Sequence, residues 1–316
     1  MTKLLWLLFI LLSCYAPFIG SAEINIKEIL DSKSLSSYIF FELRLPRIFL
    51  AFFTGMGLAL AGLLFQIIFR NPLMTPYTLG VSSGAILGAG LSVKLGLSFT
   101  VLGLGALSIF GFTGAALTIL LLMALASRVV SKGPHTLLLL GIALSLFYAA
   151  ALMVLFYLSS FTQLSTIISF TMGNLSTVGL TTLFYVALSA TLIALMSYTF
   201  RHELTILSIS AEHATLKGVN TQKLTLILLL GSSLAVGLIV SITGSIGFIG
   251  LIVPHMMMKL YKKPGIKLIL PIAMFGGLFL IASDLLARSL SAQEIPIGII
   301  TSFIGAPFFI YLIFKK

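Results

Sequence analysis

The chain has 316 residues, of which 59% are hydrophobic and 9% are charged, and its formal net charge is +11. A soluble domain carries about 25% charged residues, so this composition excludes an ordinary soluble protein and indicates a protein embedded in a bilayer. The basic residues stand singly or in adjacent pairs between long apolar runs and form no basic stripe, which argues against nucleic acid as a partner.

The first half of the chain contains five apolar stretches bounded by charged or polar residues. A helix needs about 20 apolar residues to cross roughly 30 Å of hydrocarbon. The predicted spans are residues 4–19, 48–69, 77–93, 98–126 and 136–158. Residues 1–22 also have features of a cleaved signal peptide, but we favour a first span, which serves the same purpose in a multi-span protein.

The second half is expected to add five more spans. The polar run 159–163 breaks a long uncharged stretch, so a sixth span follows near 177–200. Residues 224–258 are too many for one crossing, and Thr243-Gly244-Ser245 is predicted to divide them into a seventh and an eighth span. Residues 267–287 and 296–314 complete an all-α polytopic membrane protein of about ten transmembrane helices, with 1–316 as a single domain.

Glycine spacing in the third predicted span indicates close helix packing. Gly80, Gly84 and Gly88 recur every four residues and would form a bare ridge against which a neighbouring backbone can pack. We prefer this structural interpretation to a direct contact with substrate.

The loop charges predict the orientation. One face collects Lys3, Arg70, Arg128, Lys132, Arg201, Lys217, Lys223, Lys259, Lys262, Lys263, Lys267, Lys315 and Lys316. The other face has Lys27, Lys33, Arg44, Arg47, Lys94 and Arg288. The richer face is expected to be cytoplasmic, which places both termini in the cytoplasm.

The predicted span centres carry no charge, since all acidic residues lie at span ends or in loops. Proton-coupled carriers and membrane enzymes usually need ionisable groups inside the bilayer. The single cysteine, Cys14, and four scattered histidines fit no metal-binding spacing, and no phosphate-binding GxxxxGK[ST] motif is present. We therefore expect no enzyme activity, no metal site and no bound cofactor, with any nucleotide hydrolysed on another chain.

Arginines at the outer ends of two spans call for a reason, because that face is poor in basic residues. Arg44 and Arg47 flank Pro46, and Arg288 ends the ninth span. They either anchor at lipid headgroups or dock acidic residues of a partner, since arginine pairs bidentately with carboxylates. Asp284 lies one turn before Arg288 and is expected to pair with it.

The cytoplasmic segment 201–223 is predicted to contain a helix of about seven residues. Ser210 is a plausible N-cap and Glu212 suits the first turn, while Gly218 can adopt the left-handed closing conformation. This helix is too short to cross a membrane. It is either part of a solvated loop or a surface for a partner.

Five segments together resemble the FecCD family of ABC importer permeases. They are residues 44–47 with Gln66 and 70–73 (RNPL), residues 79–85 (LGVSSGA), residues 247–255 (GFIGLIVPH), residues 282–288 (ASDLLAR), and residues 295–301 with 305–309. They occur in family order from about residue 40 onward. The resemblance implies a ten-helix type II importer permease in a bacterial inner membrane. It also implies a homodimer, two cytoplasmic ATPase subunits and a periplasmic or lipoprotein substrate-binding protein.

The resemblance also implies roles for particular residues. Arg44, Arg47 and Arg288 match a set that docks the binding protein. Glu212, Leu216 and Gly218 match the segment that couples to the ATPase, although Lys217 is one residue more than the family pattern has. Asn71 and Leu73 resemble part of a cytoplasmic gate, with a second constriction near Pro134 and His135, where the match is poor.

The expected function is therefore ATP-driven import of a metal chelate, namely an iron–siderophore complex, haem or cobalamin. Some relatives carry oxyanions such as molybdate. The alternatives are a secondary carrier that works without ATP and a membrane scaffold without transport. Dependence on ATP and on an ATPase partner separates the first hypothesis from the other two.

Overall fold

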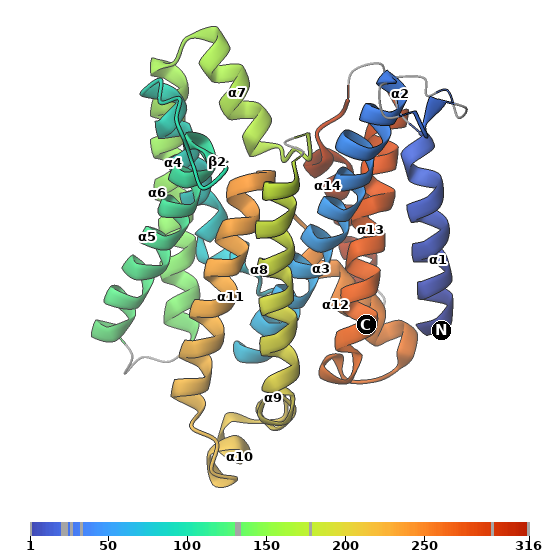
Figure 1. The fold of residues 1–316 in the computed structure, drawn as a ribbon. Helices are drawn as coiled ribbons and strands as arrows, with labels where there is room; N and C mark the ends of the chain where they lie inside the picture. Colours follow the sequence, from blue (N-terminus) through green and yellow to red (C-terminus); the bar gives the residue numbers. More distant parts are fainter. Residues whose placement is uncertain are drawn as a thin grey trace.

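The computed structural model describes residues 2–19, 25, 28–31, 34–129, 134–176, 179–291 and 294–314, and most of these are helical (Figure 1). The first seven helices are α1 (Thr2–Tyr15), α2 (Leu35–Tyr38), α3 (Leu45–Ile68), α4 (Val81–Lys94), α5 (Ala106–Val129), α6 (Pro134–Leu158) and α7 (Phe161–Thr171). The others are α8 (Leu180–Thr199), α9 (Arg201–Leu207), α10 (Ala211–Leu216), α11 (Thr221–Thr243), α12 (Ile249–Tyr261), α13 (Ile269–Ser289) and α14 (Ile297–Phe314).

Helix α3 forms the centre of the bundle. Every residue from Gly57 to Ile68 is buried, as expected for a helix that is apolar on all sides. It contacts α8 and α11 on one side and α12 and α13 on the other. Figure 1 shows α4 to α7 grouped beyond α11, and α1 beyond α13. The core therefore joins two groups of helices through one central helix.

Glycines allow the helices around α3 to approach each other closely. A Cβ atom at Gly62 would overlap the backbone of Gly250 in α12, and one at Gly55 would overlap that of Gly276 in α13. The predicted ridge is confirmed in part. Gly84 and Gly88 face the backbone of α5 at Gly114 and Phe110.

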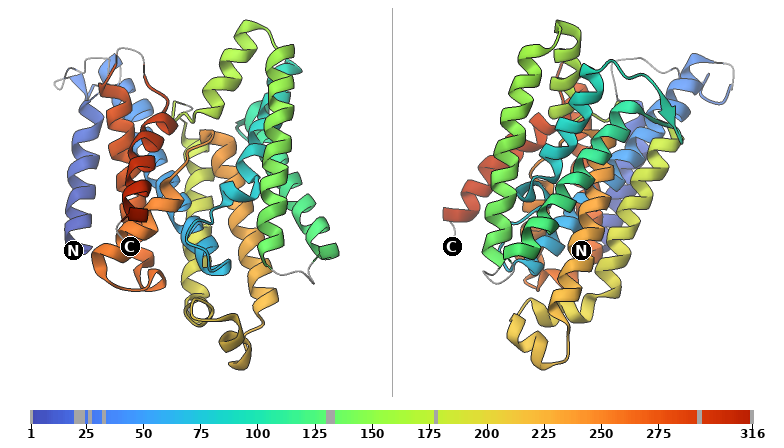
Figure 2. Two further views of the ribbon diagram at one scale, coloured as in Figure 1. Left: turned by 180° about the vertical axis from the view of Figure 1, so that it is seen from behind. Right: turned by 90° about the vertical axis from the view of Figure 1, so that its left-hand side faces the viewer.

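Several predicted spans are confirmed with small changes of boundary. The described part contains six helices long and apolar enough to cross a membrane, and shorter apolar helices at 5–18, 249–261 and 297–311. The predicted break at Thr243–Ser245 is correct, because α11 ends at Thr243 and Gly244 adopts φ +68°. The two views of Figure 2 show these helices side by side, with α10 projecting at one end.

Three predictions about the spans need correction. The third begins later than expected, because Gly80 has φ +80° and closes a 3-10 turn at Pro76–Leu79, so Gly80 lies outside the helical ridge. Residues assigned to the start of the fourth span instead form a hairpin, β1 (Thr100–Val101) and β2 (Leu104–Gly105). The polar run after α6 does more than turn the chain. Ser160 and Gln163 form a capping box that starts the additional helix α7.

Candidate functional site

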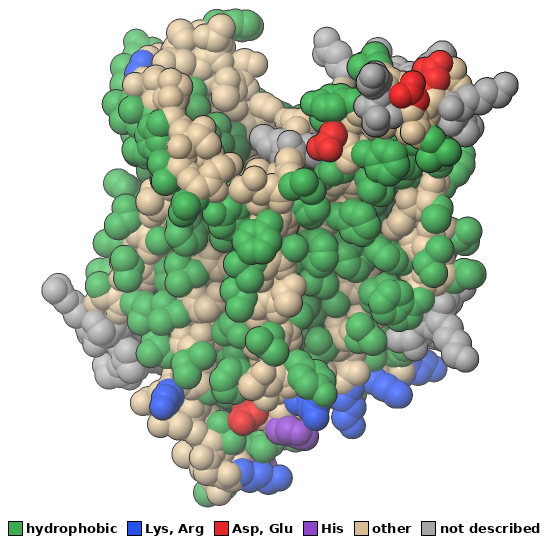
Figure 3. Space-filling model, in the orientation of Figure 1, with side chains coloured by type: hydrophobic (Ala, Val, Ile, Leu, Met, Phe, Trp, Pro, Cys, Tyr) green, Lys and Arg blue, Asp and Glu red, His purple; other side chains and the backbone are tan. Residues whose placement is uncertain are grey.

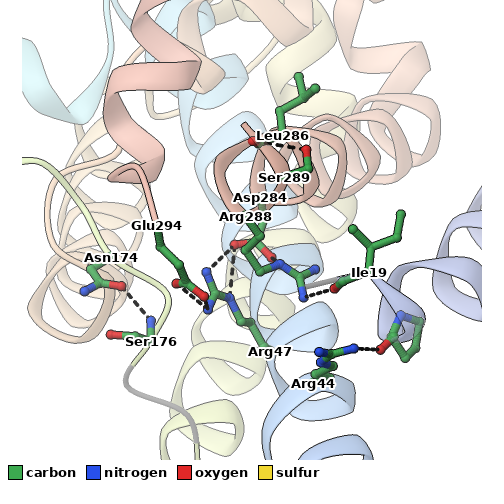
Figure 4. A network of polar contacts seen from close by, with 11 residues as sticks. Ile19, Arg44, Arg47, Asn174, Ser176, Asp284, Leu286, Arg288, Ser289 and Glu294 are labelled. Carbon is green, nitrogen blue, oxygen red and sulfur yellow. Dashed lines mark hydrogen bonds and ion pairs between the residues drawn. The ribbon is translucent and has the colours of Figure 1, made fainter. Parts of the chain in front are cut away.

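Four charged side chains meet at one place (Figure 4), near the start of α3 at the end of the bundle opposite α10 (Figure 1). Arg47 of α3 donates from Nη2 to Oδ1 of Asp284 in α13 at 2.9 Å, and from Nη1 to Oε2 of Glu294 at 2.8 Å. Arg288 Nε lies 3.0 Å from the other Asp284 oxygen. Two arginines thus face two carboxylates, which we call the outer ion network.

Arg288 of the outer ion network and the neighbouring Arg44 also hold the segment after α1. Arg44 donates to the carbonyl of Pro17 at 2.7 Å, and Arg288 donates to that of Ile19 at 3.2 Å. Arg44 and Arg288 are only 6% and 5% exposed. The three predicted docking arginines are therefore brought to one end of the bundle, but their side chains face the protein.

The sequence pointed to only part of this arrangement. The predicted pair of Asp284 and Arg288 is confirmed. The contacts of Arg47 with Asp284 and Glu294 were not anticipated, since they join positions more than 230 residues apart. Asp284 itself was a signal in the sequence, because a carboxylate in an apolar helix needs a cation at the same depth. The most exposed member is Glu294, with 41% of its side chain accessible.

At the opposite end, the segment between α8 and α11 forms the predicted short helix. The Ser210 hydroxyl accepts hydrogen bonds from the backbone N–H groups of Glu212 and His213, at 3.1 and 3.5 Å. Gly218 has φ +80° and donates to Thr215, while Val219 donates to Ala214. These bonds make up a Schellman motif. Local chemistry therefore defines both ends of α10.

The apolar side chains of this segment point in different directions. Ala214 is fully buried against the bundle, whereas Leu216 is 83% exposed and Ile209 is 72% exposed. Glu212 is also exposed. The segment thus presents a carboxylate and two large apolar side chains at the end of the molecule that is rich in lysine and arginine (Figure 3).

The predicted gate residues are partly described. The Asn71 side chain accepts from the backbone N–H of Leu73 at 3.0 Å, which makes the predicted turn after α3. Leu73 is 50% exposed. Pro134 and His135 begin α6, but their side chains lie outside the described part of the chain.

An open groove of about 660 Å³ lies where α14 meets the end of α7 and the α11–α12 connection. Its walls are apolar and carry the hydroxyl groups of Thr171, Ser245 and Ser302. The sequence did not point to this groove, because α7 was not predicted. Within the described residues, no group of three His, Cys, Asp or Glu side chains is placed to hold a metal ion.

Comparisons with known proteins agree with this architecture. The model of the FecCD transport family matches residues 7–315. The hemin transport system permease protein HmuU of Yersinia pestis is 33% identical over 100% of this chain and 96% of its own length. A permease protein assigned to an iron chelatin transport system of Helicobacter pylori is 32% identical over 92% of this chain and 88% of its own.

A solved structure extends the similarity to three dimensions. It is described as an inward-facing conformation of a metal-chelate type ABC transporter, and it has a TM-score of 0.86 and 31% identity over 100% of this chain and 99% of its own. The helical membrane fold and the separation of the permease from the ATPase subunit follow from these matches. Because the family model spans nearly the whole sequence, the chain belongs to the FecCD transport family and is a permease subunit of an ABC importer for metal chelates.

Proposed function

We propose that two copies of this chain enclose one transport pathway and work with two cytoplasmic ATPase subunits and one periplasmic or lipoprotein substrate-binding protein. The chelate is an iron–siderophore complex, haem or cobalamin. The names of the relatives in Yersinia pestis and Helicobacter pylori, which refer to hemin and iron chelatin, support this class of substrate.

The groove of about 660 Å³ along α14, which we call the α14 groove, supports a transport pathway shared by two copies of the chain. Phe303 and Ile299 line the groove and are 80% and 43% exposed, while other parts of α14 contact α12 and α13. An apolar face with scattered hydroxyl groups suits a bulky chelate that slides without being held tightly. A second copy would close the open side of the groove.

The segment 201–223 is the proposed site of coupling to the ATPase. The observation that carries this role is the exposure of Leu216 on a helix that projects from the bundle (Figure 1). Ile209 is exposed on the same short segment, and exposed apolar side chains that lie together mark a surface for a partner. Glu212 and Gly218 accompany it, the first as a polar contact and the second as the residue that ends the helix.

The outer ion network is the proposed docking point for the binding protein. Glu294, which pairs with Arg47, is the more exposed of the two side chains. An acidic residue of the binding protein would therefore displace Glu294 and pair with Arg47 in its place. Arg44 and Arg288 would then act by holding the ends of α3 and α13 in place. This exchange keeps the number of ion pairs constant, which limits the cost of docking.

The remaining proposals concern the gate and the orientation. Asn71 and Leu73 would form a constriction at the cytoplasmic mouth, with a second one near Pro134 and His135. The richer content of lysine and arginine at the end that carries α10 supports a cytoplasmic location for that end and for both termini, in the inner membrane of a bacterium.

The test is reconstitution in liposomes with the ATPase and the binding protein encoded beside this chain. ATP hydrolysis and uptake are followed while the binding protein is loaded with ferric siderophores, haem or cobalamin in turn. We expect one loaded binding protein to stimulate both. If the chain forms no complex with the ATPase and uptake follows a proton gradient, the protein is instead a secondary carrier.

A further inference from the structure

A second groove, of about 920 Å³, lies at the end of the bundle that carries α10. It runs between the α8–α9 junction and the turn that leads into α13, and α3 forms its floor. We call it the basic groove. It is separate from the α14 groove and from the outer ion network, because none of its lining residues belongs to either.

The rim of the basic groove is positively charged. Arg201, His202 and Lys267 line it, and no aspartate or glutamate does. In the described part of the chain, neither Arg201 nor Lys267 forms an ion pair with a carboxylate. Two cations that line the same groove and lack an acidic partner attract an anion.

Arg201 is held in position for such an anion. Its guanidinium carbon lies 4.2 Å from the centre of the Tyr198 ring, and its Nε lies 3.4 Å from Nε2 of His202. Stacking on an aromatic ring orders the guanidinium, and the bond from Nε to His202 leaves the N–H groups of its two terminal nitrogens to donate to an anion. Tyr198 stands at the end of α8, where an aromatic side chain suits the level of the lipid headgroups.

From this rim toward the middle of the bundle, the groove is apolar. Met56, Ala194, Leu270 and Ala273 continue it toward the hydrophobic belt of the bundle. Leu270 is 52% exposed, so the groove is open at its side. Figure 3 shows lysine and arginine side chains gathered along the lower edge of the molecule, directly under this belt.

A charged rim that leads into an apolar channel matches a phospholipid, because the phosphate can pair with the rim while an acyl chain fills the channel. A free phosphate would leave the channel uncovered, and a neutral lipid would leave the rim uncompensated. We propose that the basic groove binds one anionic phospholipid of the adjoining leaflet, with its phosphate between Arg201 and Lys267 and an acyl chain along Ala194 and Leu270.

The test is native mass spectrometry of the full chain released from nanodiscs that contain phosphatidylglycerol and phosphatidylcholine with the same acyl chains. We expect phosphatidylglycerol to be retained selectively. The double variant Arg201→Gln, Lys267→Gln should bind it roughly 30-fold more weakly, because each basic contact contributes about a factor of five. The matched control Lys262→Gln, Lys263→Gln removes two exposed charges at the same end and should bind as the unmodified chain does.

A second variant separates the headgroup from the chain. Ala194→Trp fills the apolar channel and keeps both cations, so it should also lose the lipid. Displacement by excess glycerol phosphate, or retention of phosphatidylglycerol by Ala194→Trp, would identify a site for free phosphate and overturn the proposal. Equal retention of phosphatidylcholine, or unchanged binding by the double variant, would overturn it as well.

Discussion

At the scale of single residues, the outer ion network shows how an almost uncharged bundle holds ions. The Asp284 side chain is 2% exposed and is contacted by Arg47 and Arg288 from two sides. Burying a lone carboxylate is costly, and the cost is offset only when cations and hydrogen bonds surround it. Asp284 thereby links α3 to α13 near the outer end of both helices.

Asp284→Asn should destabilise the protein strongly. It leaves the buried Arg288 without its counter-ion, and removing one partner of a buried pair typically costs about 3–5 kcal/mol. The measurement is thermal unfolding of the purified chain in detergent. Glu294→Gln is the control, since its side chain is 41% exposed and an exposed pair contributes about 0–1 kcal/mol. Equal melting temperatures for the two variants would contradict this account of Asp284.

Glu294→Gln should also strengthen docking of the binding protein, because it removes the carboxylate that competes for Arg47. Arg47→Gln should weaken docking. The measurement is the dissociation constant of the binding protein on nanodiscs, at low and at high salt. If Glu294 itself contacts a basic residue of the partner, Glu294→Gln will weaken docking instead, and the proposed exchange is then wrong.

At the scale of elements, α10 illustrates a helix stabilised by its ends. Six residues are too few to be helical alone. The short helix is stabilised instead by the Ser210 cap, the closing turn at Gly218 and the burial of Ala214. Because these contacts use neither Leu216 nor Glu212 as a side-chain partner, both remain available at the surface.

Leu216→Asp should abolish co-purification with the ATPase and leave the melting temperature of the isolated chain nearly unchanged. The side chain is 83% exposed, so little internal packing is lost. Leu260→Asp is the matched control, because it makes the same substitution at a position that is 56% exposed in the last turn of α12, outside the segment 201–223. Retained co-purification of Leu216→Asp would remove α10 from the coupling interface.

The crossing of α3 and α12 depends on the absence of a side chain. Gly62→Ala places a methyl group against the backbone of Gly250, and backbone cannot give way as a flexible side chain can. We expect a loss of about 1–3 kcal/mol or more in stability, measured by thermal unfolding. Gly105→Ala in β2 is the control, since nothing lies within 4 Å of the added methyl group. Equal stability of the two variants would mean that the helices can move apart freely.

At the scale of the whole molecule, charge is divided between the two ends. Figure 3 shows lysine and arginine along the edge that carries α10, and acidic side chains mostly at the opposite edge. The excess of lysine and arginine at one end predicts that this end lies in the cytoplasm.

Cysteine labelling tests this orientation. In a Cys14→Ser background, Lys217→Cys after α10 should resist a membrane-impermeant maleimide applied to intact cells or spheroplasts. Thr100→Cys in β1 should react, because the hairpin lies at the opposite end of the molecule (Figure 1). Both positions are exposed in the structure, so each serves as the control for the other. The reverse pattern of labelling would invert the orientation.

The sequence by itself determined whatever depends on near neighbours in the chain. Apolar runs longer than about 17 residues predicted the long helices, Thr243–Ser245 predicted the break between α11 and α12, and Ser210 and Gly218 predicted both ends of α10. Motifs spread from residue 40 to residue 309 were specific enough for the family, and with it the function. Short polar stretches were ambiguous, which is why α7 and the β1–β2 hairpin were not predicted.

Only the tertiary structure decided which distant residues meet. Arg47 was expected to be free for a partner, but it reaches Asp284 and Glu294 because α3 and α13 cross at close-packed glycines. The basic groove likewise joins Arg201 and Lys267, which no local pattern connects. Spacing along a helix determines which residues share a face, whereas helix packing determines what that face touches. The burial and pairing of charges in this permease therefore had to come from the fold.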